Sequence, residues 1–121
     1  MPIIKRENMT KSKSSAPGVE TLRLIDAEHG SLSLRVGEAT LSPGGQVPTH
    51  IHPNTEEAMV VLEGNIEAIV GDQKMSLGPG DSMLAPAGIV HGCRNRHELP
   101  AKLISMFPTQ NVEREAVELP E

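Results

Sequence analysis

The sequence predicts an all-β fold, built as an antiparallel barrel or sandwich from short strands. Segments rich in Val, Leu, Ile and Thr recur along the chain, and turn residues separate them at intervals of about 8–12 positions. Many of the 11 glycines and 10 prolines fall in these separating turns. Few windows sustain the period of an amphipathic helix. At 121 residues, the chain has the length of one ordinary domain.

The two ends of the chain are polar and are expected to flank a single folded domain. Residues 1–18 contain the run Lys-Ser-Lys-Ser-Ser and predict a flexible N-terminal arm. The alternative is that Pro2-Ile3-Ile4 adds an edge strand to a second subunit. Residues 19–108 are expected to form the β-barrel domain. Residues 109–121 carry four glutamates and predict a polar C-terminal tail, with a short terminal helix as the alternative.

Within this domain the sequence predicts nine strands, each bounded by turn residues. The separating segments include Ser42-Pro43-Gly44-Gly45 and Gly78-Pro79-Gly80-Asp81, whose residue types favour tight turns. The interior must be filled by Val, Leu, Ile and six Met, because Phe107 is the one residue among Phe, Tyr and Trp. The expected strands span residues 21–26, 31–41, 46–52, 57–63, 65–70, 73–77, 82–85, 89–94 and 101–107.

Composition and charge exclude several classes of partner. The net charge of −5, with 11 scattered basic residues, supplies no field that attracts nucleic acid. No run approaches the roughly 18 apolar residues of a membrane span. The charged N-terminus has no apolar run behind it, which argues against a signal peptide. Cys93 is the single cysteine, so we expect no internal disulfide and a reducing, cytoplasmic environment.

Two histidines at the end of one expected strand have the spacing of a metal chelate. Side chains alternate between the faces of a strand, so His50 and His52 point the same way and Ile51 points to the other face. The two histidines lie about 6–7 Å apart along the backbone. Both rings can therefore reach one metal ion at about 2.1 Å.

A carboxylate follows this pair at the start of the next expected strand. The segment Pro53-Asn54-Thr55 turns the chain, and the returning strand brings either Glu56 or Glu57 beside the histidines. If Glu57 faces inward, Met59 and Val61 follow it into the barrel, and this is the favoured arrangement.

A third histidine lies in a later segment that has its own turn. Pro86 and Gly88 predict a tight turn, and His91 follows on the next strand, from which it can reach the same ion across the barrel. Cys93, two residues further, is expected on the same inward face. It is either a reactive thiol near the metal or a small buried hydrophobe, and packing is the favoured role.

These two stretches resemble the two sequence motifs of the cupin superfamily, G-x5-HxH-x3,4-E-x6-G and G-x5-PxG-x2-H-x3-N. The matching positions are Gly44, His50, His52, Glu57 and Gly64 in the first motif, and Gly80, Pro86, Gly88, His91 and Asn95 in the second. The register of the first motif selects Glu57 over Glu56. The resemblance implies an antiparallel double-stranded β-helix, the cupin or jelly-roll barrel, and a homodimer. The metal ligands that it implies are His50, His52, Glu57 and His91.

Several further residues are expected to line the cavity of such a barrel. Arg35, on the strand before the first motif, either anchors an anionic substrate or is a solvated surface residue, and solvation is the favoured interpretation. The candidates for the cavity wall are Arg35, Gln46, Met59, Val61, Met83, Cys93 and Met106. The scarcity of aromatic residues argues against an aromatic substrate.

The implied ligand set favours catalysis over a closed structural site. Three neutral imidazoles and one carboxylate leave two positions of an octahedral ion open to exchangeable ligands. The expected cofactor is one divalent metal ion per chain, namely iron, manganese, nickel or zinc. The predicted function is an enzyme that acts on a small oxygenated molecule as a dioxygenase, an isomerase or a lyase. The alternative is a non-catalytic module that binds or senses a small molecule or a metal, and no separate catalytic residue is assigned.

Overall fold

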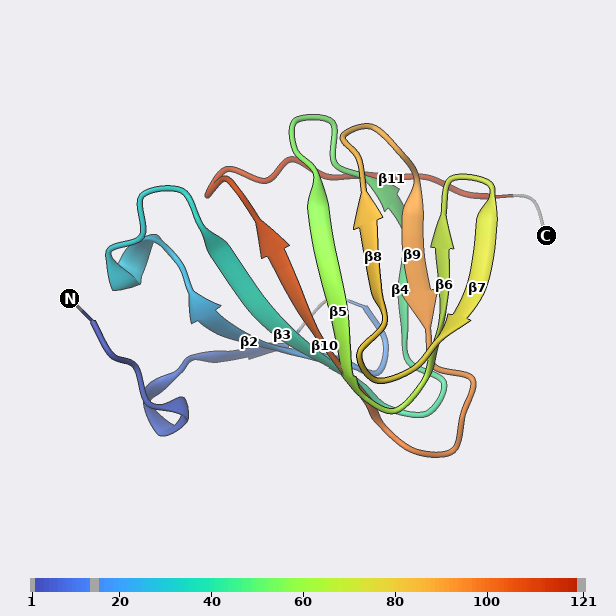
Figure 1. The fold of residues 1–121 in the computed structure, drawn as a ribbon, viewed down its shortest axis with the longest axis horizontal. Helices are drawn as coiled ribbons and strands as arrows, with labels where there is room; N and C mark the ends of the chain where they lie inside the picture. The colour runs from blue at the N-terminus through green and yellow to red at the C-terminus, as the bar shows by residue number, and fades with distance from the viewer. Residues whose placement is uncertain (1, 14–15, 120–121) are drawn as a thin grey trace.

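The computed structural model describes residues 2–13 and 16–119, which fold as two antiparallel β-sheets that face each other (Figure 1). Two short 3-10 helices, η1 (Arg6–Asn8) and η2 (Ala27–His29), lie before β1 and β3. The strands are β1 (Lys11–Lys13), β2 (Val19–Ile25), β3 (Arg35–Leu41), β4 (Gln46–Ile51), β5 (Glu57–Glu63), β6 (Ile66–Val70), β7 (Gln73–Leu77), β8 (Ser82–Ala85), β9 (His91–Arg94), β10 (Ala101–Phe107) and β11 (Glu115–Ala116). Within the described ranges, no helix has the length and apolar character that crossing a membrane requires.

The order of the strands in each sheet is that of a double-stranded β-helix. One sheet has the order β1-β2-β3-β10-β5-β8, and the other has the order β11-β4-β9-β6-β7. Strands β3 and β10 are far apart in the sequence but pair along their lengths, from Leu41 opposite Ala101 to Arg35 opposite Phe107. From β3 onward the chain passes back and forth between the sheets, as Figure 1 shows. The predicted all-β, antiparallel double-stranded β-helix is confirmed.

Aliphatic side chains fill the space between the sheets. Alternate residues of β5 and β10 face inward, so that Val61 and Leu103 are buried opposite each other. Leu41 and Ile66 are also among the largest fully buried side chains. Burial of each such side chain stabilises the fold by about 1.5–3 kcal/mol. The buried apolar cluster consists of Val19, Leu41, Met59, Val61, Ile66, Ala68, Cys93, Ala101 and Leu103.

The turn between β5 and β6 requires a glycine. Gly64 has a φ of 75°, in the left-handed region that favours glycine. A Cβ at this position would lie 2.5 Å from the carbonyl oxygen of Pro100 and 2.8 Å from the Cα of Ala101. The last fixed glycine of the first motif therefore serves the close approach of two backbones rather than the chemistry of a site.

Strands β3 and β9 begin later than the sequence predicts. The strand expected from residue 31 begins at Arg35, because the exposed Leu32 lies in a loop after η2. The strand expected from residue 89 begins at His91, because the backbone N–H of Ile89 closes a turn on the carbonyl oxygen of Pro86. In both places apolar side chains occur outside a strand. A prediction that relies on apolar residues alone therefore places the start of the strand too early.

Both ends of the chain carry a short strand that pairs with the barrel. Strand β1 lies antiparallel to β2 at the edge of the six-stranded sheet, inside the segment expected as a flexible arm. Strand β11 pairs with β4, with Glu115 opposite Ile51, inside the segment expected as a polar tail. After β10 the chain crosses from one sheet to the other along the top of the molecule in Figure 1. The division into arm, domain and tail stays a prediction.

Candidate metal centre

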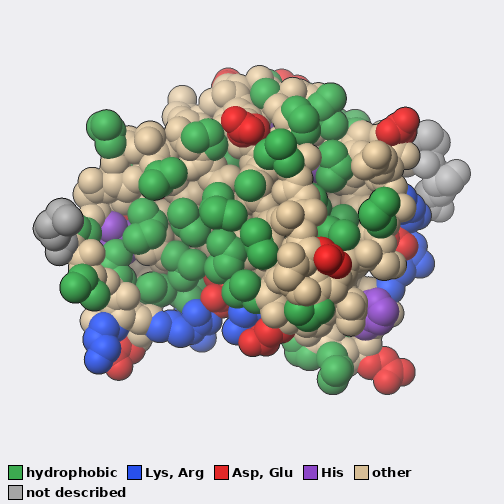
Figure 2. All heavy atoms as spheres, viewed as in Figure 1, with side chains coloured by type: hydrophobic (Ala, Val, Ile, Leu, Met, Phe, Trp, Pro, Cys, Tyr) green, Lys and Arg blue, Asp and Glu red, His purple; other side chains and the backbone are tan. Residues whose placement is uncertain are grey.

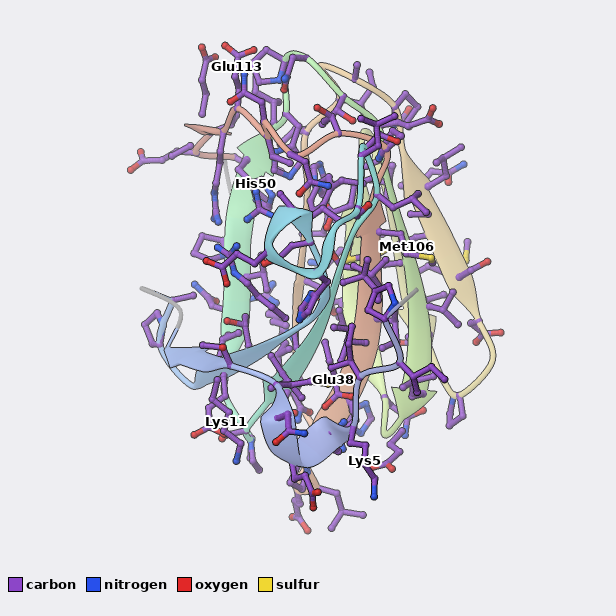
Figure 3. All side chains as sticks on the ribbon, turned by 90° about the vertical axis from the view of Figure 1, so that its left-hand side faces the viewer. Lys5, Lys11, Glu38, His50, Met106 and Glu113 are labelled. Atoms are coloured by element: carbon purple, nitrogen blue, oxygen red, sulfur yellow. The ribbon has the colours of Figure 1, made fainter. Side chains whose placement is uncertain are left out.

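Four buried side chains with metal-ligating atoms meet between the two sheets. His50 lies on β4 (Figure 3), and His52 follows directly after this strand. Glu57 is the first residue of β5, and His91 is the first residue of β9. One potential ligand atom of each residue lies within 4.8 Å of those of the other three. The structure thus brings together the group that the sequence predicts, whereas the competing Glu56 is exposed.

The close approach of β4 and β9 places His50 beside His91. The two residues are opposite each other in the register, and their ring centroids are 4.3 Å apart. Pro48 has no N–H to donate to β9, and the register shifts between Val47 and His50. Gly92 permits the approach, because a Cβ there would lie 2.8 Å from the carbonyl oxygen of Val47.

All three histidines carry their ring proton on Nδ1. A carbonyl oxygen only accepts hydrogen bonds, so a ring nitrogen that contacts one must donate. The contacts are His50 Nδ1 to the oxygen of Pro48 at 2.7 Å, His52 Nδ1 to that of Glu113 at 2.8 Å, and His91 Nδ1 to that of Ile89 at 3.0 Å. The unprotonated Nε2 atoms are left for the common centre, and this is the tautomer that a metal ion requires.

In this tautomer the atoms that face the centre are all acceptors. The Nε2 atoms of His50 and His52 lie 3.2 Å apart. Oε1 of Glu57 lies 2.9 Å from Nε2 of His91 and 3.2 Å from Nε2 of His52. Acceptors at these distances need a proton or a cation among them. The residues present therefore fit a divalent ion held by three imidazole nitrogens and one carboxylate oxygen.

Burial and hydrogen bonds set the charges of these side chains in the metal-free protein. Burial by itself raises the pKa of Glu57, but its contacts with His52 and His91 and the hydrogen bond from Ser105 outweigh burial and lower the pKa to about 2. Burial lowers the pKa of His50 to about 4. At pH 7 both groups are therefore in the form that binds a metal. For His52, burial is opposed by Glu57, to which the protonated form of the ring donates a hydrogen bond, and the net effect raises the pKa of His52.

Two residues of β10 complete the surroundings of the cluster. The hydroxyl of Ser105 donates a hydrogen bond of 2.8 Å to Oε2 of Glu57, so that Oε1 is left to face the histidines. The ring of Phe107 lies edge-on to that of His52, with 5.1 Å between the centroids. Neither role is predicted from the sequence. The available signal is a serine between Leu103 and Phe107 on the inward face of a strand, since a buried hydroxyl needs a partner.

The cluster lies on the wall of a cavity of about 390 Å³ between the sheets. Of the residues expected to line this cavity, Arg35, Met59 and Cys93 do so. Aliphatic side chains make up much of the remaining wall, which agrees with the composition. Among the described residues, those expected on the wall but found elsewhere are Gln46, Val61, Met83 and Met106.

Each of these four residues lies elsewhere for a simple reason. Met106 points to the outer side of β10, because alternate residues of this strand face inward (Figure 3). Gln46 is exposed at the beginning of β4. Val61 does face inward, but it is buried in the apolar cluster below the cavity, and Met83 packs against that cluster from β8. Strand alternation predicts the face of a residue but not its depth in the barrel.

Cys93 lines the cavity as a packing residue rather than as a nucleophile. Its side chain belongs to the buried apolar cluster. Burial raises the pKa of its thiol to about 12, so the thiol stays protonated at pH 7. Arg114, which also lines the cavity, is not predicted from the sequence, because it reaches the site only through the path of the chain after β10.

Comparison with known proteins agrees with this fold. A family model described as "Cupin domain" matches residues 37–107. A germin-like protein from Morus alba is 30% identical over 114 residues, which cover 90% of this chain and 50% of that protein. The chain spans about half the length of the curated relatives that it matches.

Two solved structures are similar to nearly the whole chain. The polyketide cyclase RemF from Streptomyces resistomycificus has a TM-score of 0.87 and 24% identity, over 100% of this chain and 88% of that chain. A sugar phosphate isomerase from a cupin superfamily, from Silicibacter pomeroyi, has a TM-score of 0.82 and 23% identity, over 98% of this chain and 83% of that chain. At these identities the likeness concerns the fold. The family model covers more than half of the chain and includes all four clustered residues, so the chain belongs to the cupin family.

Proposed function

We propose that this chain is a metal-dependent enzyme that acts on a small oxygenated molecule. One divalent ion per chain, iron, manganese, nickel or zinc, would be held by His50, His52, Glu57 and His91. The observation that carries the proposal is the meeting of three imidazole lone pairs and a carboxylate oxygen, all acceptors, at the wall of a cavity. When bound, such an ion polarises a carbonyl or hydroxyl oxygen, or lowers the pKa of a water molecule.

The surrounding residues would hold the ligands in place and limit the access of water. Ser105 fixes the carboxylate of Glu57, and three backbone carbonyl oxygens fix the histidine rings. Met59, Val47 and Leu103 contribute apolar walls to the cavity. In a cavity with few water molecules, electrostatic interactions with a bound molecule are stronger than in bulk solvent.

Three reaction types suit this site, namely those of a dioxygenase, an isomerase and a lyase. Each requires an oxygen atom of the substrate to approach the histidine cluster from the cavity. The polyketide cyclase and the sugar phosphate isomerase that share the fold are both enzymes, which supports catalysis here without selecting a reaction.

The proposal includes a homodimer in a reducing cytoplasm, the compartment that suits a free cysteine. Figure 2 shows hydrophobic side chains gathered over the outer face of the six-stranded sheet. Strand pairing places Met106, Ala58 and Leu84 in one row across β10, β5 and β8. In a twofold dimer the same surface patch of each subunit packs against that of the other. This apolar face can therefore be covered by the same face of a second copy of the chain. Light scattering should give twice the mass of the chain, and a monomer at all concentrations would contradict this part of the proposal.

Metal analysis combined with a turnover assay tests the function. The metal-loaded protein should convert members of a panel of keto, enol and phenolic acids, measured by oxygen uptake for oxygenation and by product analysis for isomerisation or cleavage. The His91→Ala variant should lose both metal and turnover. The His97→Ala variant changes an exposed histidine and should keep both. Tight metal binding without any conversion across the panel would instead identify a binding or sensing module.

A further inference from the structure

Three arginine side chains line the cavity, and two of them have no carboxylate partner among the residues that the structure describes. These residues are Arg23, Arg35 and Arg114. Nη1 of Arg23 lies 3.1 Å from Oδ2 of Asp26, so its charge is compensated. Within residues 2–13 and 16–119, neither Arg35 nor Arg114 forms an ion pair.

The carboxylates that line the same cavity are already engaged. Glu57 lies against His52 and His91 within the candidate metal centre. Glu38 accepts two hydrogen bonds from Arg6, at 2.9 Å and 2.5 Å. The cavity therefore carries two positive charges that no described side chain compensates, one on the half-buried Arg35 and one on the exposed Arg114. An uncompensated cation favours the binding of an anion, and more strongly where the cation is partly desolvated.

Arg35 lies on the six-stranded side of the cavity, close to the metal cluster. Its Cζ is 5.9 Å from the ring centroid of Phe107, and that ring is 5.1 Å from the ring of His52. Nη1 of Arg35 donates one hydrogen bond of 3.4 Å to the carbonyl oxygen of Gln110, which leaves other N–H groups of the fork for a ligand. The half-buried guanidinium is thus held at the cavity without being neutralised.

Arg114 approaches the cavity from the C-terminal segment. It lies between Glu113, whose carbonyl oxygen holds His52, and strand β11, which pairs with β4. Figure 3 shows His50 and Glu113 at the same end of the molecule. The side chain of Arg114 lines the same cavity as His50 and His52, so this guanidinium lies on the wall that carries the cluster.

We propose that Arg35 and Arg114 form a carboxylate-binding subsite, and that the molecule bound in this cavity is a small organic acid. Its carboxylate lies at the two guanidinium groups, and a second oxygen, from a keto, enol or hydroxyl group, lies toward the histidine cluster. The placement of the second oxygen rests on the proposed function, whereas the carboxylate subsite does not. The planar guanidinium fork matches a carboxylate in geometry as well as in charge. A cavity of about 390 Å³ is at the lower end of the range for small-molecule sites, which favours a compact acid.

Calorimetric titration of the metal-free 121-residue chain tests the subsite apart from the metal. The probes are succinate and 2-oxoglutarate, compared with succinamide, which lacks the charges, and with inorganic phosphate. Both acids should bind, and the diamide should not. Arg35→Gln and Arg114→Gln should each weaken the binding of the acids by about 10-fold or more. Arg96→Gln is the matched control, because Arg96 is exposed and paired with Glu67, and it should leave the affinity unchanged.

The outcomes separate the subsite from the proposed metal chemistry. Equal binding of succinamide, or unchanged affinity in both arginine variants, would overturn the subsite. Tighter binding of phosphate than of either acid would overturn the assignment to carboxylates. Both acids should bind the metal-free wild type, so a failure of the protein to take up metal concerns the proposed function alone. Repeating the titrations with zinc-loaded protein keeps the comparison valid if metal removal destabilises the chain.

Discussion

The Nδ1 atom of His52 lies 2.8 Å from the carbonyl oxygen of Glu113, a residue 61 positions later in the chain. This bond joins the candidate metal centre to the segment that crosses between the sheets in Figure 1. Asn54 holds the same segment, because its Nδ2 donates to the carbonyl oxygen of Asn111 at 2.6 Å and its Oδ1 accepts from the N–H of Glu113 at 3.0 Å. The C-terminal segment therefore orients a candidate ligand and is part of the site.

Removal of residues 109–121 should weaken metal binding by about 10- to 100-fold, because His52 loses the acceptor that orients its ring. The Asn54→Ala variant loosens the segment without removing it and should show a smaller loss. A titration against a competing chelator measures both changes. Asn65→Ala, in the exposed turn after β5, is the control and should bind metal like the wild type. Equal metal affinity of the truncated and full chains would contradict a role for the segment.

The Ser105→Ala variant should raise the pKa of Glu57 and weaken metal binding by about 10-fold. The substitution removes the hydrogen bond of 2.8 Å that holds Oε2 of the carboxylate and lowers its pKa. It should also lower the free energy of unfolding by about 1 kcal/mol. Chelator competition and urea unfolding measure the two effects. Ser76→Ala changes an exposed serine on β7 and should alter neither quantity. An unchanged metal affinity in Ser105→Ala would remove the serine from the site.

The stability of the metal-free protein should fall in mild acid, because His50 is buried in its neutral form. Its pKa is about 4 in the folded protein against an ordinary value of 6.5, so between these pH values the unfolded chain binds more protons. Stability is therefore fully present above pH 6.5 and is lost as the pH falls to 4. The loss should be on the order of 3 kcal/mol. Urea unfolding after metal removal measures it, and the His50→Gln variant should lack this dependence.

Glu57 and His52, which lie beside His50, also contribute to the pH dependence of the stability. Glu57 has a pKa of about 2 against 4.5, so it contributes a second loss of stability as the pH falls from 4.5 to 2. The pKa of His52 is raised, so its contribution is present below pH 6.5 and is lost as the pH rises through the folded value. A wild-type profile that stays flat from pH 6.5 to 4 would show that His50 is not buried as described.

The Gly92→Ala variant should destabilise the fold and displace His91. The added methyl group would lie 2.8 Å from the carbonyl oxygen of Val47, so β9 must move away from β4. We expect a loss of about 1–3 kcal/mol in the free energy of unfolding, together with weaker metal binding. Gly37→Ala is the matched control, because its methyl group would meet the carbonyl oxygen of Leu22 at an ordinary 3.6 Å. If the two variants are equally stable, the close approach of β4 and β9 does not require a glycine at position 92.

The four candidate ligands are predictable from the sequence because local rules and the two cupin-like motifs together place them; the motifs assign Glu57 and His91. Strand alternation sets His50 and His52 on one face, and the following turn returns Glu57 beside them. Ser105 and Arg114 are not predictable in this way. Their positions depend on the pairing of β10 with β5 and on the crossing of the C-terminal segment, which are contacts between residues far apart in the chain.

The short strands at the chain ends are not predictable from the sequence for the same reason. Strands β1 and β11 exist because β2 and β4 offer free edges, while their own residues are polar and weak strand formers. The cavity wall shows a related limit. Met59 and Val61 share one face of β5, yet only Met59 reaches the cavity, because the depth along the barrel follows from the register with neighbouring strands.

The most direct test is the stoichiometry of metal binding to the purified 121-residue chain, measured by elemental analysis and by titration of the metal-free protein. Our account predicts one divalent ion per chain. It also predicts an affinity that falls by more than about 100-fold in His50→Ala and in His91→Ala, with folding retained by circular dichroism. The same affinity in these folded variants as in the wild type, or no uptake of iron, manganese, nickel or zinc, would contradict the proposed metal centre.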